Sequence, residues 1–164
     1  SDDLLFVARN VLTERWNRGL PTYILSLDLT KAFDNADIAL IPTIFKSYGV
    51  PHCLINRLIK SCFHEKNSVR WFGQLTQPVQ KARGIKQGCP ISPNIFNYLL
   101  DYAILELKTE LMHLSPPIEL CIGEPDLPLA LPLVLAYADD ETFLSPTLEK
   151  LDIIVRSFLP LLQR

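Results

Sequence analysis

The chain has 164 residues, of which 48% are hydrophobic and 21% are charged, and its formal net charge is −2. A chain of this length can bury one substantial core, and this composition excludes an intrinsically disordered protein. The longest apolar run, residues 127–136, is too short to span a membrane. The four cysteines show no spacing typical of zinc, so we expect reduced, mostly buried thiols in an intracellular protein.

The charges are unevenly distributed along the chain. Residues 60–86 contain six basic residues and one acidic residue, a net charge of +5, and the remainder carries 10 basic and 17 acidic residues. Trp71 lies within this basic stretch, which we expect to contact a nucleic-acid backbone, although a lone tryptophan is more often a core residue. For Arg83 and Lys86 a solvated surface position is an equal alternative. The cations assigned to this contact are Arg70, Lys81, Arg83 and Lys86.

The first third of the chain predicts helices around one short strand. Residues 23–27 form a mostly apolar run typical of a buried strand, which places Asp28 at its end. Asp34 can cap the helix that follows, and this helix begins late or bends at Pro42. The predicted helices cover residues 2–17, 36–48 and 51–64.

The remainder of the chain predicts strands and two further helices. Gly73 joins a predicted strand pair, Ser92 can cap a long amphipathic helix, and Pro160 disturbs the last helix. Strands and helices interleave without a strict βαβ order, which favours an α+β fold. The predicted strands cover residues 68–72, 76–81, 118–122, 133–137 and 141–144, and the predicted helices begin near residues 93 and 147.

Three motifs carry candidate chemistry. The first, LDLTKAFD, covers residues 27–34. Asp28 ends an apolar strand, so its side chain can point into a site, and a helix cap is an equal alternative. Taken alone, Lys31 is a surface cation and Phe33 is a core aromatic residue.

The second motif, RGIKQGCPISP, covers residues 83–93. Gly84 and Gly88 permit a positive φ angle and close approach of the backbone to a ligand. The loop leads into the N-terminus of a helix, which is suited to anions, although an ordinary strand–loop–helix connection is the alternative.

The third motif is YADD at residues 137–140, which lies between apolar segments. An ionised carboxylate in apolar surroundings is costly without a counter-charge, and the nearest Lys or Arg in the sequence is Lys150. A divalent metal ion held by Asp139 and Asp140 is therefore expected, which suggests phosphoryl-transfer chemistry. A plain turn is the alternative.

In this order and spacing, the three motifs resemble the palm of reverse transcriptases. The segment GIKQGCPISPNIFN looks like the second core motif of that family, and it is most similar to the non-LTR (LINE-type) retrotransposon branch. The resemblance implies an α+β fold over residues 1–164, with an antiparallel palm sheet backed by helices and partial fingers. It also implies an RNA-directed DNA polymerase that adds a dNTP to the 3′-hydroxyl of a DNA primer on an RNA template.

The resemblance implies a role for each motif residue. Two Mg²⁺ ions, for which Mn²⁺ can substitute, would be held by Asp28 and Asp139, with help from Asp140 and from the backbone carbonyl of Leu29. Phe33 would exclude the 2′-hydroxyl of a ribonucleotide. The other residues implied to contact nucleotide or nucleic acid are Lys31, Gln87, Gly88 and Tyr137.

The family has N-terminal finger strands and a C-terminal thumb, and we expect both to belong to a longer polyprotein. The alternative is a truncated, non-catalytic remnant that binds nucleic acid or protein through the same fold. No membrane association is expected, and the resemblance favours a nuclear location.

Overall fold

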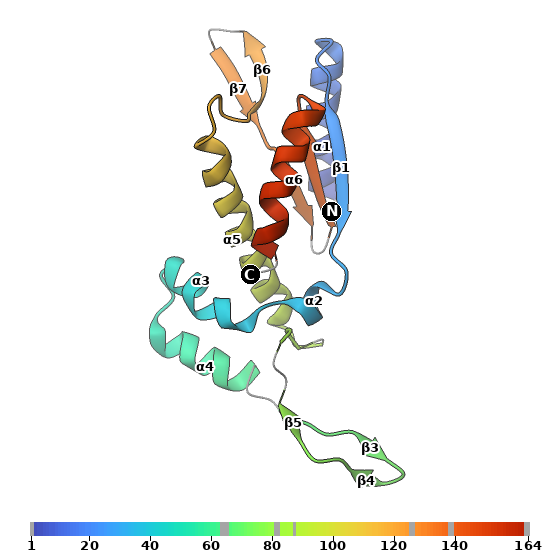
Figure 1. Cartoon of the computed structure of the whole chain (residues 1–164), viewed down its shortest axis with the longest axis vertical. Coiled ribbons are helices and arrows are strands. Elements are labelled where there is room, and N and C mark those ends of the chain that lie inside the picture. The colour runs from blue at the N-terminus through green and yellow to red at the C-terminus, as the bar shows by residue number, and fades with distance from the viewer. Residues whose placement is uncertain are drawn as a thin grey trace. The chain divides into compact units, whose positions relative to one another are not determined.

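The computed structural model describes residues 2–62, 66–80, 83–86, 88–124, 127–137 and 140–162. It divides into two compact units (Figure 1): unit 1 consists of Ser1–Thr30 and Ala103–Arg164, and unit 2 of Lys31–Tyr102. Helix α5 (Ser92–Met112) contributes to both units. In the part of the chain that is described, no helix is long and apolar enough to cross a membrane.

An antiparallel sheet organises unit 1. Its described strands lie in the order β1-β9-β8, so β9 is central. Helix α1, which precedes β1, confirms the helix predicted over residues 2–17, and the strand pair β8 and β9 was also predicted. The elements are α1 (Asp2–Asn17), β1 (Tyr23–Asp28), β8 (Val134–Tyr137), β9 (Asp140–Ser145) and α6 (Leu148–Leu162).

Helices α1 and α6 cover opposite faces of the sheet. Leu144 of β9 belongs to a buried cluster with Val11 of α1. The next residue towards the turn, Phe143, packs its ring against Phe158 of α6 with centroids 5.0 Å apart. Because consecutive side chains of a strand point to opposite faces, α1 and α6 lie on different sides of the sheet (Figure 1).

A second hairpin completes the core beneath α1. Strands β6 (Leu120–Glu124) and β7 (Leu127–Leu131) pair antiparallel, and the fully buried Leu120 joins the cluster of Val11. The sequence predicted a strand near β6 but not β7, because β7 contains Pro128. A proline is tolerated at the edge of a two-stranded sheet, where its missing N–H costs no ladder bond.

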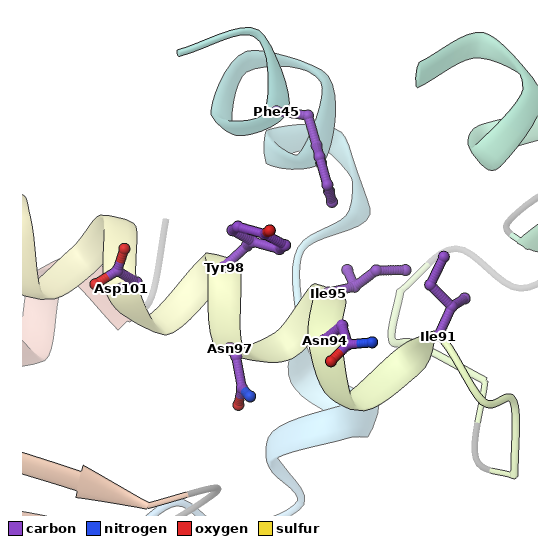
Figure 2. A pocket seen from close by; sticks show the side chains of 7 residues that line it. All are labelled: Phe45, Ile91, Asn94, Ile95, Asn97, Tyr98 and Asp101. Atoms are coloured by element: carbon purple, nitrogen blue, oxygen red, sulfur yellow. The ribbon is translucent and has the colours of Figure 1, made fainter. Parts of the chain in front are cut away.

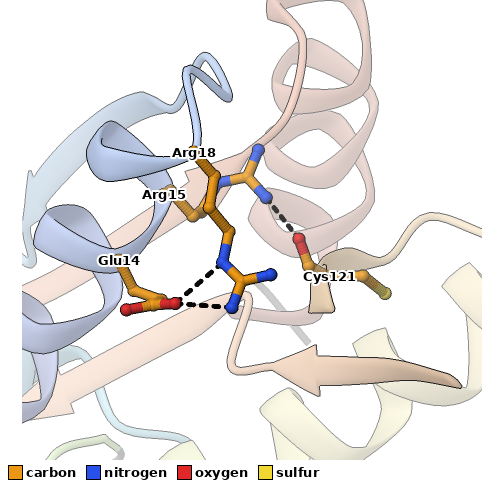
Figure 3. A network of polar contacts seen from close by, with 4 residues as sticks. All are labelled: Glu14, Arg15, Arg18 and Cys121. Atoms are coloured by element: carbon orange, nitrogen blue, oxygen red, sulfur yellow. Dashed lines mark hydrogen bonds and ion pairs between the residues drawn. The ribbon is translucent and has the colours of Figure 1, made fainter. Parts of the chain in front are cut away.

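A buried arginine joins three segments of unit 1 (Figure 3). Arg15 is 3% exposed, and its guanidinium donates to Thr22 Oγ1 at 2.6 Å, to the Cys121 carbonyl at 2.6 Å and to the Pro21 carbonyl at 2.7 Å. Burial lowers the pKa of Arg15 from its ordinary value. The neighbouring Arg18 instead forms an exposed ion pair with Glu14. No sequence pattern singled out Arg15.

Unit 2 combines short helices with the first half of α5. Of the helix predicted over residues 36–48, the α-helix begins only at Ile41, the late start that Pro42 allowed, and a short 3-10 helix precedes it. The cap predicted at Asp34 is wrong, since Asp37 accepts the capping bond from the Ala39 N–H at 2.8 Å. Pro42 lies at the start of α3, as its position in the sequence allowed. The elements are α2 (Ala32–Asn35), η1 (Ile38–Leu40), α3 (Ile41–Ser47) and α4 (His52–Cys62).

The basic stretch of unit 2 forms an antiparallel hairpin, as predicted. The first pair, β2 and β5, lies nearer the rest of the chain, and β3 and β4 flank the turn at Phe72 and Gly73. Every residue from 66 to 80 is exposed. The strands are β2 (Lys66–Asn67), β3 (Arg70–Trp71), β4 (Gln74–Leu75) and β5 (Val79–Gln80).

Four further expectations fail, and they concern burial, capping and the effect of a proline on a helix. Strand β1 is not buried, since Tyr23 is 41% and Ile24 49% exposed. The hydroxyl of Ser92 has no hydrogen-bond partner among the described atoms, so it does not cap α5. Helix α6 continues through Pro160 to Leu162. The three thiols whose burial is described are not buried: Cys53 is exposed, and Cys89 and Cys121 are half-buried.

Candidate active site

The strand register of unit 1 brings two of the predicted carboxylates together. Asp28 is the last residue of β1, Asp140 is the first residue of β9, and the two are direct cross-strand partners. Direct partners on antiparallel strands project from the same face, with Cα atoms about 4.5–5.5 Å apart. Both residues are exposed. Asp140 also pairs with Tyr137, so the end of β8 lies on its other side.

The same face carries a pair of hydroxyls next to the carboxylates. Ser26 and Thr142 are the next same-face partners along β1 and β9, and their oxygens lie 3.3 Å apart. The following pair on this face contains Leu144, which is buried against α1. The face therefore changes from apolar core to hydroxyls to exposed carboxylates, and α1 leaves its acidic end open to solvent.

The two carboxylates lack a cationic partner within the described ranges, where neither Asp28 nor Asp140 forms an ion pair. Two like charges about 5 Å apart repel by about 1 kcal/mol in water, and by more as solvent is excluded. Carboxylate oxygens are the ligands that Mg²⁺ prefers. This donor set therefore fits a divalent cation.

Other predicted members of the site are only partly covered by the structure. Asp139 lies outside the described residues, and within those residues no group of three or more acidic, His or Cys side chains could hold a metal ion. Leu29 follows Asp28 directly, so its carbonyl lies next to the pair in the chain. For Tyr137 only the backbone is described.

The glycine loop of unit 2 packs against the chain itself. The Gly84 N–H donates to the Ala36 carbonyl at 2.9 Å, and the Ile85 N–H donates to the Phe33 carbonyl at 2.7 Å. A Cβ atom at Gly84 would lie 2.6 Å from the backbone oxygen of Asp34. The close approach predicted for Gly84 is therefore made to the protein's own backbone. The expectation that it accommodates a ligand is wrong.

Gly88 differs from Gly84 in its surroundings. Its φ angle is +81°, and no atom lies within 4 Å of where a Cβ atom would stand, so space for a ligand is open there. Gln87 lies outside the described residues.

Phe33 and Lys31 lie on the short segment that the loop holds. The half-buried ring of Phe33 stacks on Phe96 of α5, with centroids 5.1 Å apart and planes at 26°. This contact fixes the ring while leaving part of it accessible. Lys31 adopts a left-handed φ of +53°, an uncommon conformation for a residue with a side chain.

The predicted nucleic-acid contacts are surface residues where they are described. Arg70 lies on β3 of the hairpin, and Arg83 and Lys86 lie in the glycine loop. All three are exposed. Lys81 lies outside the described residues.

A groove of about 750 Å³ lies beside α5 in unit 2 (Figure 2). Phe45 of α3 and Tyr98 of α5 line it and pack against each other, with ring centroids 5.1 Å apart. Tyr48 donates a hydrogen bond to Asp101, and burial together with this bond raises the pKa of Tyr48 to about 12. None of the predicted site residues that the structure describes lines this groove.

Taken together, unit 1 presents a pair of exposed carboxylates at the end of an antiparallel sheet. Residues 4–164 match the family model described as "Reverse transcriptase (RNA-dependent DNA polymerase)". The chain therefore belongs to the reverse transcriptase family, and its relatives place it in the LINE-type branch.

The curated relatives are proteins of retrotransposable elements. The "Retrovirus-related Pol polyprotein from type-1 retrotransposable element R2" of Popillia japonica is 33% identical over 71% of this chain and 15% of its own length. The corresponding type-2 R2DM protein of Drosophila melanogaster is 33% identical over 54% of this chain and 8% of its own. The "Transposon TX1 uncharacterized 149 kDa protein" of Xenopus laevis is 28% identical over 92% of this chain. The chain thus spans 8–15% of the length of these relatives.

A solved structure supports the fold. The apo telomerase of Candida tropicalis, truncated from its C-terminal domain, matches 95% of this chain and 30% of its own with a TM-score of 0.60 at 19% identity. This likeness confirms an α+β polymerase fold.

Proposed function

We propose that this chain is the core of an RNA-directed DNA polymerase from a retrotransposon-like element. It would join a dNTP to the 3′-hydroxyl of a DNA primer on an RNA template. Unit 1 would be the palm, and unit 2 would be part of the fingers. The observation that carries this proposal is the pairing of Asp28 with Asp140 on one exposed sheet face.

The chain's residues would divide the work by their positions. Asp28 and Asp139, with help from Asp140, would hold two Mg²⁺ ions, and Leu29 would add a carbonyl oxygen. Bound divalent ions supply a lowered pKa for the attacking hydroxyl and charge neutralisation for the leaving pyrophosphate. The β1–β9 ladder fixes the carboxylates before substrate arrives, which reduces the cost of organising charge during the reaction.

Unit 2 would select and position the nucleotide. The stacked ring of Phe33 would exclude a 2′-hydroxyl, because its contact with Phe96 prevents the ring from moving aside. The open space at Gly88 would accept the nucleotide or the template base, next to Gln87. Lys31, Arg83 and Lys86 would neutralise phosphates.

A non-catalytic nucleic-acid-binding module is the second candidate function. It is favoured by the basic hairpin, which is exposed throughout and needs no metal ion to bind phosphate. The two candidates agree on binding and differ on synthesis.

Primer extension separates them. We expect Mg²⁺-dependent addition of a dNTP to a DNA primer on an RNA template, and loss of this addition in Asp28→Asn and Asp139→Asn. The matched control is Asp152→Asn, an exposed aspartate paired with Arg156 on α6, which should extend the primer like the wild type. Extension that is absent in the wild type, or unaffected by the first two substitutions, would refute catalysis by this chain.

A further inference from the structure

The tip of the basic hairpin exposes two aromatic side chains. Phe72 is 92% exposed and Trp71 is 70% exposed. Their rings lie at 87° with centroids 5.2 Å apart, so each ring leaves faces open to solvent. The sequence alone favoured a core position for Trp71, and the structure excludes that position.

The turn itself holds Phe72 outward. Phe72 has a φ angle of +46° and is followed by Gly73 at +79°, so a side chain occupies a backbone conformation that L-residues rarely adopt. A residue with a large side chain in this backbone conformation tends to mark a functional position. A large apolar ring at this place gains nothing from folding, because it remains in water.

The two faces of the hairpin differ in chemistry. Partners in the register share a face, so Trp71 lies with Gln74, and Arg70 lies with Leu75 on the other side. Two residues, 68–69, separate β2 from β3, whereas three residues, 76–78, separate β4 from β5 on the opposite side of the hairpin. The extra residue forms a bulge in the segment that contains Pro78. Next to the tip, one face is therefore aromatic and the other carries a cation.

The charge of the hairpin selects its partner. Residues 66–80 contain two basic residues, Lys66 and Arg70, and no acidic residue. Aromatic rings that stack with bases, combined with cations that contact phosphates, characterise surfaces that bind single-stranded nucleic acid. With two basic residues and no acidic residue, the hairpin attracts a polyanion more strongly than an uncharged apolar partner.

We propose that the hairpin tip binds unpaired bases of a single-stranded nucleic acid by stacking on Trp71 and Phe72, while the positive charge of Lys66 and Arg70 attracts its phosphates to the hairpin without stacking contact. This inference rests on the proposed function, and it identifies the single-stranded template as the ligand of the hairpin. Duplexes are poor ligands, because their bases are already stacked on one another.

The two tryptophans of the chain allow a direct test. Trp16 is 84% exposed on α1 in unit 1, so Trp16→Phe leaves Trp71 as the sole tryptophan. In this variant we expect a 12-nucleotide oligouridylate to quench the fluorescence of Trp71, and a blunt RNA duplex of equal length to quench it far less. Phe72→Ala should weaken oligouridylate binding about 5- to 150-fold, the range for loss of one base–aromatic stack.

Leu75→Ala is the matched control, because Leu75 is 64% exposed on the opposite face of the same hairpin. Binding within twofold of the parent is expected for it. The proposal is overturned by absence of quenching, by equal effects of Phe72→Ala and Leu75→Ala, or by concentration-dependent self-association that Phe72→Ala abolishes in sedimentation.

Failure of the stacking site and failure of the proposed polymerase function give different results. Asp28→Asn should leave quenching unchanged, so binding without primer extension would refute catalysis and support the stacking site. Primer extension without quenching would refute the stacking site alone.

Discussion

Substituting alanine for Gly84 and for Gly88 of the second motif should destabilise the chain to different extents, although the two glycines have similar backbone conformations. Both have a left-handed φ angle, +84° at Gly84 and +81° at Gly88, so an alanine at either position pays a similar conformational cost of about 1–2 kcal/mol. Their surroundings differ. At Gly84 a Cβ atom would lie 2.6, 2.9 and 3.0 Å from backbone atoms of Asp34, and at Gly88 it would meet nothing within 4 Å.

The clash at Gly84 cannot be relieved by rotating a side chain, because all three neighbours are backbone atoms. Moving these backbone atoms strains two hydrogen bonds, from the Gly84 N–H to the Ala36 carbonyl and from the Ile85 N–H to the Phe33 carbonyl. Each is worth about 1 kcal/mol. Overpacking adds about 1–3 kcal/mol. We therefore expect Gly84→Ala to lower the free energy of unfolding by about 2–4 kcal/mol more than Gly88→Ala does.

Urea unfolding at equilibrium measures this difference as a shift of the midpoint at unchanged slope. Equal losses in the two variants would refute the packing described for the loop. Because Gly88→Ala retains most of the stability, it also permits a test of function: its KM for dNTP should rise if the open space at Gly88 accepts the nucleotide.

Three further predictions concern other parts of the chain. Arg15→Met should lower the free energy of unfolding by about 3–5 kcal/mol, because it removes three hydrogen bonds donated by a buried, charged guanidinium, whereas Arg18→Met should cost about 0.5 kcal/mol or less; equal urea midpoints would contradict this. Phe33→Ala should allow NTPs to be incorporated in primer extension, and unchanged discrimination between dNTP and NTP would refute the steric role. The pKa of Tyr48 is raised to about 12, so the folded chain keeps this proton where the unfolded chain loses it. Stability should therefore fall as pH rises from about 10 to 12, and by less in Tyr48→Phe, as measured by unfolding across that range.

The spacing of apolar residues along the chain was enough to predict several helices and strands. The apolar spacing of residues 2–17 predicted α1, and the apolar flanks of Asp140 predicted β8 and β9. The prediction that β1 is buried failed, because burial depends on which strands and helices lie beside a strand. Among the described strands of its sheet, β1 lies at the edge. The sequence placed Asp28 at a strand end, but only the register showed that it lies opposite Asp140.

Tertiary contacts also decided the helix boundaries of unit 2. The sequence offers Asp34 and Asp37 as caps, and the carbonyls of Phe33 and Ala36 are engaged by the loop at Gly84. Helix α2 ends at Asn35, next to these bonds, and Asp37 then caps the helix η1 that follows. Arg15 could not be found from its spacing, because its three acceptors come from segments that meet only in the folded chain.

We infer that the register of β1 and β9 builds a divalent-metal site at Asp28 and Asp140. Mn²⁺ binding by the chain alone, followed through the electron paramagnetic resonance signal of the free ion, tests this claim without requiring synthesis. We predict that the wild type and Asp152→Asn bind Mn²⁺ equally, and that Asp28→Asn loses at least about tenfold in affinity, as expected when a carboxylate ligand is lost. Equal binding by the wild type and Asp28→Asn would contradict the account.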